Sequence, residues 1–185
     1  STALVHNVSA KGTLTVSLNA SSPSAATYAL GVSNYTFAKF DFTSVGEDII
    51  IAQINILMAT SADNTKTAAA GDVNNIKIYD GSILIGTDPT ISSGKAEFGV
   101  TLTVPKNTTK ILTIVGDIPA ASDAVSLVAT IKEAADVVIT GKDSGISLNT
   151  TGSFGVFANL MTKGVPVVTV IAATTPVAQT YIKGT

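Results

Sequence analysis

The sequence contains no cysteine and no tryptophan, and it has a single histidine, His6. Without cysteine the protein can form no disulfide, thiol nucleophile or thiolate metal site. A zinc site or a Ser-His-Asp triad would need unusual partners for one lone imidazole. We therefore interpret His6 as a surface or strand-packing residue, and we expect no metal site, no catalytic residues and no enzymatic activity.

Charge is also scarce, because charged residues make up 13% of the chain and the net charge is −2. Soluble domains usually carry about a quarter charged residues. The absence of a basic cluster argues against a nucleic-acid partner. Phosphate-binding glycine motifs are missing, so we expect no nucleotide cofactor and no other cofactor. No apolar run approaches the roughly 20 residues of a membrane-spanning helix.

Hydroxyl side chains are abundant, with 17 serines and 26 threonines among the 185 residues. Few charges combined with many hydroxyls is typical of extracellular structural proteins, whose surfaces are wettable but weakly charged. We therefore expect an extracellular location at a cell surface.

Most apolar stretches alternate with polar residues at a period of two, which is the signal of half-buried β-strands. Residues 13–18 alternate hydroxyl and aliphatic side chains. Residues 95–104 place every even-numbered, apolar side chain on one face. The predicted buried face of residues 49–58 consists of Ile50, Ala52, Ile54, Ile56 and Met58.

Residues 75–86 predict a β-hairpin with Asp80-Gly81 at its turn, because this pair suits the positive φ angles of a type I′ turn. Further strands are predicted at residues 35–42, 111–115, 125–131, 137–140 and 154–161. Residues 132–135 suggest one helical turn, and residues 63–71 a mobile loop. Together these patterns predict an all-β fold of about ten strands, an antiparallel β-sandwich of immunoglobulin-like or jelly-roll style.

The end of the chain repeats its beginning. Asn7, Lys11 and Gly12 return as Asn159, Lys163 and Gly164. The later matches are Thr15-Val16 with Thr169-Val170, and Pro23, Tyr28 and Gly31 with Pro176, Tyr181 and Gly184. A period this long is a whole domain rather than a solenoid unit. We thus predict an N-terminal arm at 1–11 that copies a module-closing strand, a sandwich module at 12–165, and a segment at 166–185 that copies the opening strand.

Two stretches resemble a recurring β-sandwich module of large bacterial surface proteins. They are DVNNIKIYDGS with LIGT, from Asp72 to Thr87, and VTLTVPKNTTKILTIVGD, from Val100 to Asp117. Such modules occur in tandem in secreted proteins, and the closing stretch from Asn159 to Val170 is similar to their connection to the next module. The resemblance covers most of the chain and implies a β-sandwich exposed outside the cell. Its motifs belong to turns and cores and imply no catalytic residues.

The acidic residues are scattered, mostly at or near turns, where a short aspartate side chain stabilises the local backbone. This explanation is preferred over calcium binding, since no spacing matches an EF-hand loop. Glu47-Asp48 could be half of a catalytic carboxylate pair, but no partner is evident, so glycosidase chemistry is unsupported.

Five Asn-x-Ser/Thr sequons raise the possibility of attached glycans, although a composition rich in hydroxyls explains the number equally well. They are Asn7, Asn19, Asn34, Asn107 and Asn149.

The leading hypothesis is a self-assembling extracellular protein whose partners are copies of itself. It would be a subunit or module of a surface filament, a pilus-like fibre or a surface layer. Head-to-tail joining would use either a peptide bond or a donated strand. The residues expected to carry assembly are Thr13, Leu14, Val16 and Leu18 on the acceptor side, and Val167, Val168, Val170 and Ile171 as donor, or the arm 2–8 in the reverse polarity. The alternative is a carbohydrate-binding or adhesive module, for which aromatic residues, 5% of the chain, are sparse.

Overall fold

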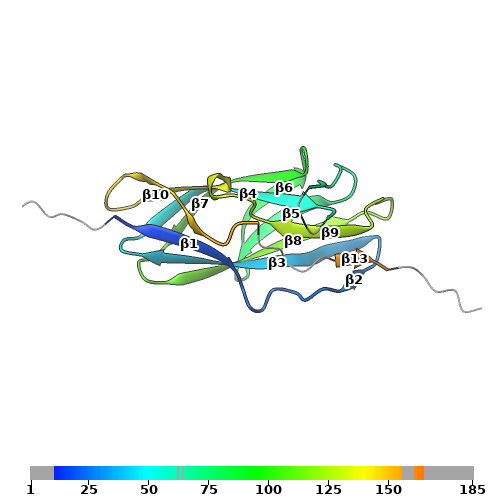
Figure 1. Cartoon of the computed structure of the whole chain (residues 1–185), viewed down its shortest axis with the longest axis horizontal. Coiled ribbons are helices and arrows are strands. Elements are labelled where there is room, and N and C mark those ends of the chain that lie inside the picture. The colour runs from blue at the N-terminus through cyan, green and yellow to red at the C-terminus, as the bar shows by residue number, and fades with distance from the viewer. Residues whose placement is uncertain (1–10, 62, 64, 156–160, 165–185) are drawn as a thin grey trace, which may run out of the picture.

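The computed structural model describes residues 11–61, 63, 65–155 and 161–164. These residues form two β-sheets packed face to face into an elongated sandwich (Figure 1). The strands are β1 (Thr13–Leu18), β2 (Thr27–Tyr28), β3 (Val32–Val45), β4 (Ile49–Ala59), β5 (Asn74–Asp80), β6 (Ile83–Thr90), β7 (Lys95–Val104), β8 (Thr109–Ile118), β9 (Ser126–Thr130), β10 (Val137–Gly141), β11 (Ser147–Leu148), β12 (Thr151–Gly152) and β13 (Met161–Lys163).

One sheet has the order β12-β1-β3-β8-β5-β6. The other has the order β11-β10-β4-β9-β13-β2, and β7 pairs with the edge of β4 opposite to β10. Most pairs are antiparallel, but β1 with β12 and β2 with β13 are short parallel pairs. The predicted β-sandwich is confirmed. The described part of the chain holds thirteen strands rather than about ten, because several are only two or three residues long.

In strands where apolar and polar residues alternate, the apolar side chains form one face, and that face is buried in the core. In β7 the even-numbered residues, among them Phe98 and Val104, are buried as predicted. In β3 the aromatic side chains of Phe37, Phe40 and Phe42 all enter the core. They can do so because the pairing with β8 shifts between Thr36 and Ala38, which moves later residues to the other parity.

The predicted buried face of β4 is wrong at its first half. Ile49 and Ile51 are buried there, whereas Ile50 is half-buried and Ala52 is exposed. The pairing with β7 shifts between Ile51 and Gln53, so the buried parity changes at this irregularity. Because β4 is apolar at almost every position, its sequence contains no alternation from which this change of buried face could be predicted.

The predicted hairpin is formed by β5 and β6, but its turn lies one residue later than expected. Asp80 pairs with Ile83, so Gly81 and Ser82 are the central residues. Gly81 has φ of +61° and Ser82 is not among the positive-φ residues, which is the pattern of a type II′ turn. The predicted helical turn is a short 3₁₀ helix at Ala134–Asp136.

The connection between β4 and β5 contains the predicted mobile loop, and part of it packs on the sandwich. Ala68 is buried, and its N–H donates to the Met58 carbonyl at 2.9 Å. The predicted strand at 154–161 is wrong at its start, since Phe154 and Gly155 lie in a turn. Met161 belongs to β13, and residues 156–160 lie outside the described part of the chain. Within the described residues, no helix is long and apolar enough to cross a membrane.

Candidate functional site

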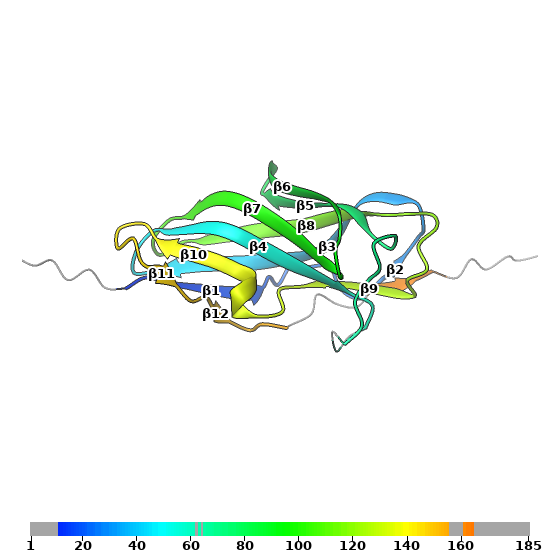
Figure 2. The same cartoon turned by 90° about the horizontal axis from the view of Figure 1, so that it is seen from above.

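The described chain enters the sandwich at one end of its long axis and leaves at the other, as the blue and orange strands show (Figures 1 and 2). We define the entry pole as Gly12 with the β3–β4 turn, the β7–β8 turn and the β10–β11 loop. The exit pole is Gly164 with the segment after β2, the β4–β5 loop and the β8–β9 loop. The two ends of the described chain therefore lie at opposite poles of the sandwich.

The entry pole is organised around the carboxylate of Glu47, which is 1% exposed. Its Oε1 accepts from the Gly12 N–H at 3.0 Å and the Ser144 hydroxyl at 2.8 Å. Its Oε2 accepts from the N–H groups of Asp143 and Ser144, both at 2.9 Å. One side chain thus ties the residue before β1 to a loop more than 130 positions later in the sequence.

These hydrogen bonds stabilise the charged form of the carboxylate. The Ser144 amide, followed by the Gly12 amide, the Ser144 hydroxyl and the Asp143 amide, holds the pKa of Glu47 below its usual value against the opposing effect of burial. The neighbouring Asp48 accepts from the Lys106 N–H at 2.8 Å and from Lys142 Nζ at 3.1 Å. Those contacts likewise lower the pKa of Asp48.

At the exit pole the last described strand, β13, lies between β9 and β2. Met161 is fully buried, and the Gly164 N–H donates to the Tyr28 carbonyl at 2.8 Å. The Tyr28 hydroxyl in turn donates to the Ala124 carbonyl at 2.7 Å, joining β2 to the β8–β9 loop. Burial, with the nearby charge of Asp72 as a smaller cause, raises the pKa of Tyr28 to about 12.

We expect Tyr28→Phe to lower the free energy of unfolding by about 1 kcal/mol, because the Ala124 carbonyl loses its partner in a buried site. Urea denaturation measures this difference. Tyr79→Phe is the matched control, since the half-buried Tyr79 has no hydroxyl hydrogen bond within the described part of the chain. Equal stability of the two variants would contradict the role given to Tyr28.

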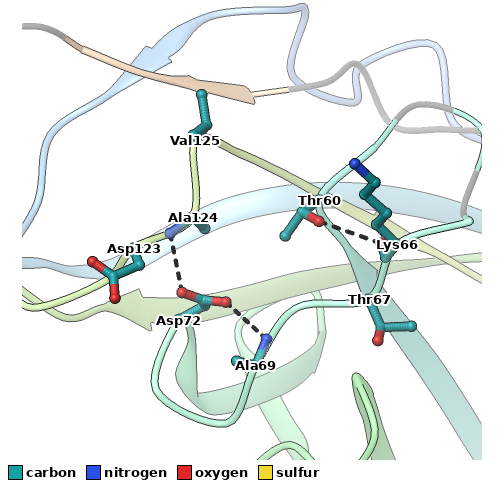
Figure 3. Close-up of a pocket in the computed structure, with 8 residues that line it drawn as sticks. All are labelled: Thr60, Lys66, Thr67, Ala69, Asp72, Asp123, Ala124 and Val125. Carbon is teal, nitrogen blue, oxygen red and sulfur yellow. Dashed lines mark hydrogen bonds between the residues drawn. The ribbon is translucent and has the colours of Figure 1, made fainter.

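A pocket of about 380 Å³ opens at the exit pole between the β4–β5 and β8–β9 loops (Figure 3). Its lining is Thr60, Lys66, Thr67, Ala69, Asp72, Asp123, Ala124 and Val125. Asp72, 7% exposed, accepts from the N–H groups of Ala69 at 2.7 Å and Ala124 at 3.1 Å and from the Ser122 hydroxyl at 3.2 Å. Its carboxylate therefore holds the two loops together, and none of the eight lining residues is aromatic.

The other turn aspartates support the structural interpretation of the acidic residues. Asp63 accepts from Ser61 and from the hydroxyl and N–H of Thr65, and these contacts lower its pKa to about 2. Among the described residues, no three His, Cys, Asp or Glu side chains gather into a group that could hold a metal ion.

The residues expected to accept a donated strand lie in β1, and most of that strand is already paired or buried within the chain's own sandwich. Leu14 and Val16 are buried in the chain's own core, Leu18 is half-buried and Thr13 is exposed. One edge of β1 pairs with β3, and part of the other is covered by β12 through Thr15 with Thr151 and Val16 with Gly152. The predicted donor residues Val167, Val168, Val170 and Ile171, the arm 2–8 and His6 lie outside the described residues.

Four of the five sequons fall in the described part of the chain. Asn34, Asn107 and Asn149 are exposed, while Asn19 is half-buried and donates to Asp41 at 2.6 Å. Asn34 and Asn107 have φ of +54° and +57°, a conformation that asparagine tolerates better than most residues. Local backbone geometry thus explains two of these asparagines, and glycosylation stays a prediction; Asn7 lies outside the described residues.

Sequence reasoning considered Glu47 only as half of a catalytic pair and missed its structural role. The signal that could have found this role is the repeated Lys-Gly dipeptide. A Cβ atom on Gly12 would lie 2.5 Å from Glu47 Cγ, so a glycine is required at this position. No known protein family matches the sequence, and no curated protein was found to match it.

Proposed function

We propose that this chain is a structural module of a head-to-tail extracellular array, such as a surface filament, a pilus-like fibre or a surface layer. The observation that carries the proposal is the terminal repeat, considered with the role that each repeated residue has in the fold. Gly12 and Gly31 are both restricted, the first by the Glu47 side chain and the second by its φ of +75°. Both glycines return, as Gly164 and Gly184.

The apolar residues of the repeat follow the same rule. In the register that aligns Thr15-Val16 with Thr169-Val170, the buried Leu14 and Val16 correspond to Val168 and Val170. Tyr28, which is 2% exposed, corresponds to Tyr181. The C-terminal segment thus has suitable side chains for the core positions of an opening strand, which supports the start of a second copy of the module.

The polarity of the array follows from the residues at β13. Met161 is buried, and the Tyr35 hydroxyl contacts its sulfur at 3.3 Å. Its counterpart in the N-terminal arm is Ser9, a smaller and polar side chain that would fill this position poorly. Insertion of the arm into another copy is therefore disfavoured, and the C-terminal segment is the better candidate for the connection.

Two joins remain compatible with this polarity. A donated segment could replace β1 only if β1 left its own sheet, where Leu14 and Val16 are already buried. A peptide bond to the next module requires no such exchange, and we favour it. The carbohydrate-binding alternative would need a stacking aromatic, and the residues lining the described pocket offer none.

The test is the intact mass of the native polypeptide combined with negative-stain electron microscopy of native material. We expect filaments or a lattice, and a polypeptide mass of several modules if the join is a peptide bond. A mass near one module with filaments would indicate strand exchange. Dispersed particles with the mass of one module would contradict the proposal.

A second arm of the test uses matched substitutions. Val168→Asp with Val170→Asp places charges at core positions of the next opening strand. We expect it to destabilise the following module if the join is a peptide bond, and to abolish assembly if the segment is a donated strand. Val167→Ser with Ile171→Ser is the control, because the register assigns these residues to the outward-facing positions of Thr13 and Ser17. A charged variant with unchanged stability and unchanged assembly would count against the proposed role of this segment.

A further inference from the structure

We propose that the free edge of β7 pairs antiparallel with the same edge of a second copy, so that two sandwiches join side by side. We call the backbone of residues 99–104 on the side away from β4 the β7 edge. This contact is lateral, whereas the proposed array is joined head-to-tail, so the inference goes beyond the proposed function. It involves only residues 95–106 of the described chain.

The β7 edge has no strand beside it in the part of the chain that the structure describes. β7 pairs with β4 along one side, and no other described strand pairs with it. The β5–β6 hairpin lies beside the first half of β7, where Asp88 accepts from the Glu97 N–H at 2.9 Å. Beyond this point β7 forms the outline of the molecule (Figure 2). Its outward N–H and C=O groups can therefore pair with another strand.

The other outermost strands of the two sheets carry features that discourage pairing with another chain. β2, β11 and β12 are each only two residues long. β6 contains Asp88 and Pro89, and its pairing with β5 is irregular between Ile78 and Tyr79. Short strands, charges, prolines and irregularities are the usual protection of sheet edges. The β7 edge, with the sequence GVTLTV, contains no charge and no proline, so it is the edge best suited to a partner.

β7 keeps its alternation through the irregularity in its pairing with β4. The shift lies between Ile51 and Gln53, and it changes the buried face of β4. Along β7 the alternation continues, with Val100 and Leu102 buried and Thr101 exposed. A strand whose side chains alternate without interruption presents regularly spaced backbone groups at its edge. The irregularity therefore leaves the β7 edge able to form a ladder.

The side of the sandwich is slightly open along the β7 edge. Val100 and Leu102 are 8% and 7% exposed, whereas Ala96, Phe98 and Val104 are 2% exposed or less. Among the buried residues of β7, exposure is thus greatest in the middle of the edge. A paired strand from a second copy would remove this remaining apolar area from water.

The charges that flank the β7 edge favour an antiparallel arrangement. Glu97 precedes the edge and Lys106 follows it, and both are exposed. In a two-fold arrangement with Thr101 of one copy opposite Thr101 of the other, position 97 faces position 105. Glu97 of one copy then lies next to Lys106 of the other, and opposite charges stabilise such a pair. A parallel arrangement would instead place Glu97 beside Glu97.

A single pair of strands buries little surface, so each lateral contact is weak. We expect the isolated chain to associate only at high protein concentration. Along a head-to-tail array the same contact recurs in every module, and each later contact forms at a high effective concentration. Many weak strand pairs would then hold arrays side by side. This consequence rests on the proposed function, but the pairing of two copies does not.

The experiment measures self-association of the full chain by sedimentation at increasing protein concentration. Thr101→Lys with Thr103→Lys places like charges against each other in the two-fold pair, and we expect the dissociation constant to rise by about tenfold or more. Thr87→Lys with Thr90→Lys is the matched control on β6, where both threonines are exposed, and we expect no change. A parent chain that stays monomeric at high concentration, or equal association of the two variants, would overturn the inference.

Because the chain contains no cysteine, a single introduced cysteine identifies which residues meet. Thr101→Cys is expected to form a disulfide-linked dimer under mild oxidation, since opposite residues of an antiparallel pair have Cβ atoms about 4.5–5.5 Å apart. Thr87→Cys is the control and is expected to form such dimers much more slowly. Similar rates for the two variants would overturn the pairing, and this comparison decides if the lysine variant does not fold.

The lateral contact and the head-to-tail join can fail separately. Val168→Asp with Val170→Asp leaves the β7 edge unchanged, so we expect the single chain to dimerise in this variant as in the parent. Loss of dimers there would show that association uses the C-terminal segment, and would overturn pairing through β7. A parent chain without dimers would overturn the lateral contact, whereas the head-to-tail join is judged on the mass and assembly of native material.

Discussion

Replacing Glu47 with alanine is expected to lower the melting temperature by about 10 °C, the largest effect of any single polar substitution considered. The change removes the acceptor of four hydrogen bonds in a buried site, from Gly12, Asp143 and the amide and hydroxyl of Ser144. The β10–β11 loop would lose its attachment to the start of β1. Thermal unfolding followed by circular dichroism measures the shift, and hydrogen exchange at residues 142–146 locates it.

Glu97→Ala is the matched control, because Glu97 is an exposed carboxylate on β7 whose side chain makes no hydrogen bond within the described residues. We expect this variant to melt within about 2 °C of the parent, as is usual for isolated surface positions. Similar melting of both variants would show that the Glu47 contacts contribute little to stability.

The same carboxylate should make the fold sensitive to acid. Its pKa is lowered in the folded protein, so its stabilising contribution is complete above the pKa of an unfolded glutamate, about 4.3. That contribution is lost as the pH falls through the lower pKa of the folded state. We expect Glu47→Gln to be less stable than the parent at pH 7 and to depend less on pH below about 5.

The second large effect is expected from Gly152→Ala, which should destabilise the fold by about 2–3 kcal/mol and cause self-association. Gly152 has φ of +137°, and an added Cβ would lie 2.0 Å from the Val16 carbonyl oxygen. The obstacle is backbone, so β12 would have to leave β1. An uncovered strand edge is a template for pairing with another chain.

Urea denaturation measures the stability change, and sedimentation velocity over a range of concentrations measures the association. Gly99→Ala is the control, because Gly99 has no neighbour within 4 Å of an added Cβ and no positive φ. A Gly152 variant that stayed monomeric with parental stability would show that β12 does not protect the edge of β1.

The amino-acid sequence determined the β-sandwich and most strand positions because alternation is a local property. Within residues 95–104 the polarity of each residue indicates the face of the strand on which it lies, and the even-numbered residues of β7 are buried as this pattern predicts. The sequence also revealed the terminal repeat, because it requires only a comparison of the chain with itself. The repeat showed that the glycine at position 12 recurs, but it did not show that the Glu47 side chain leaves no room for a larger residue there.

The tertiary structure alone decided the features that depend on distant segments. The parity change in β4 arises from its pairing with β7, and the cover on β1 comes from residues more than 130 positions away. Glu47 acquires its role only when Gly12 and the loop at 143–144 meet around it, across separations of 35 and 96 residues. Local periodicity carries no information about which loops share a pole, since that depends on how two twisted sheets pack.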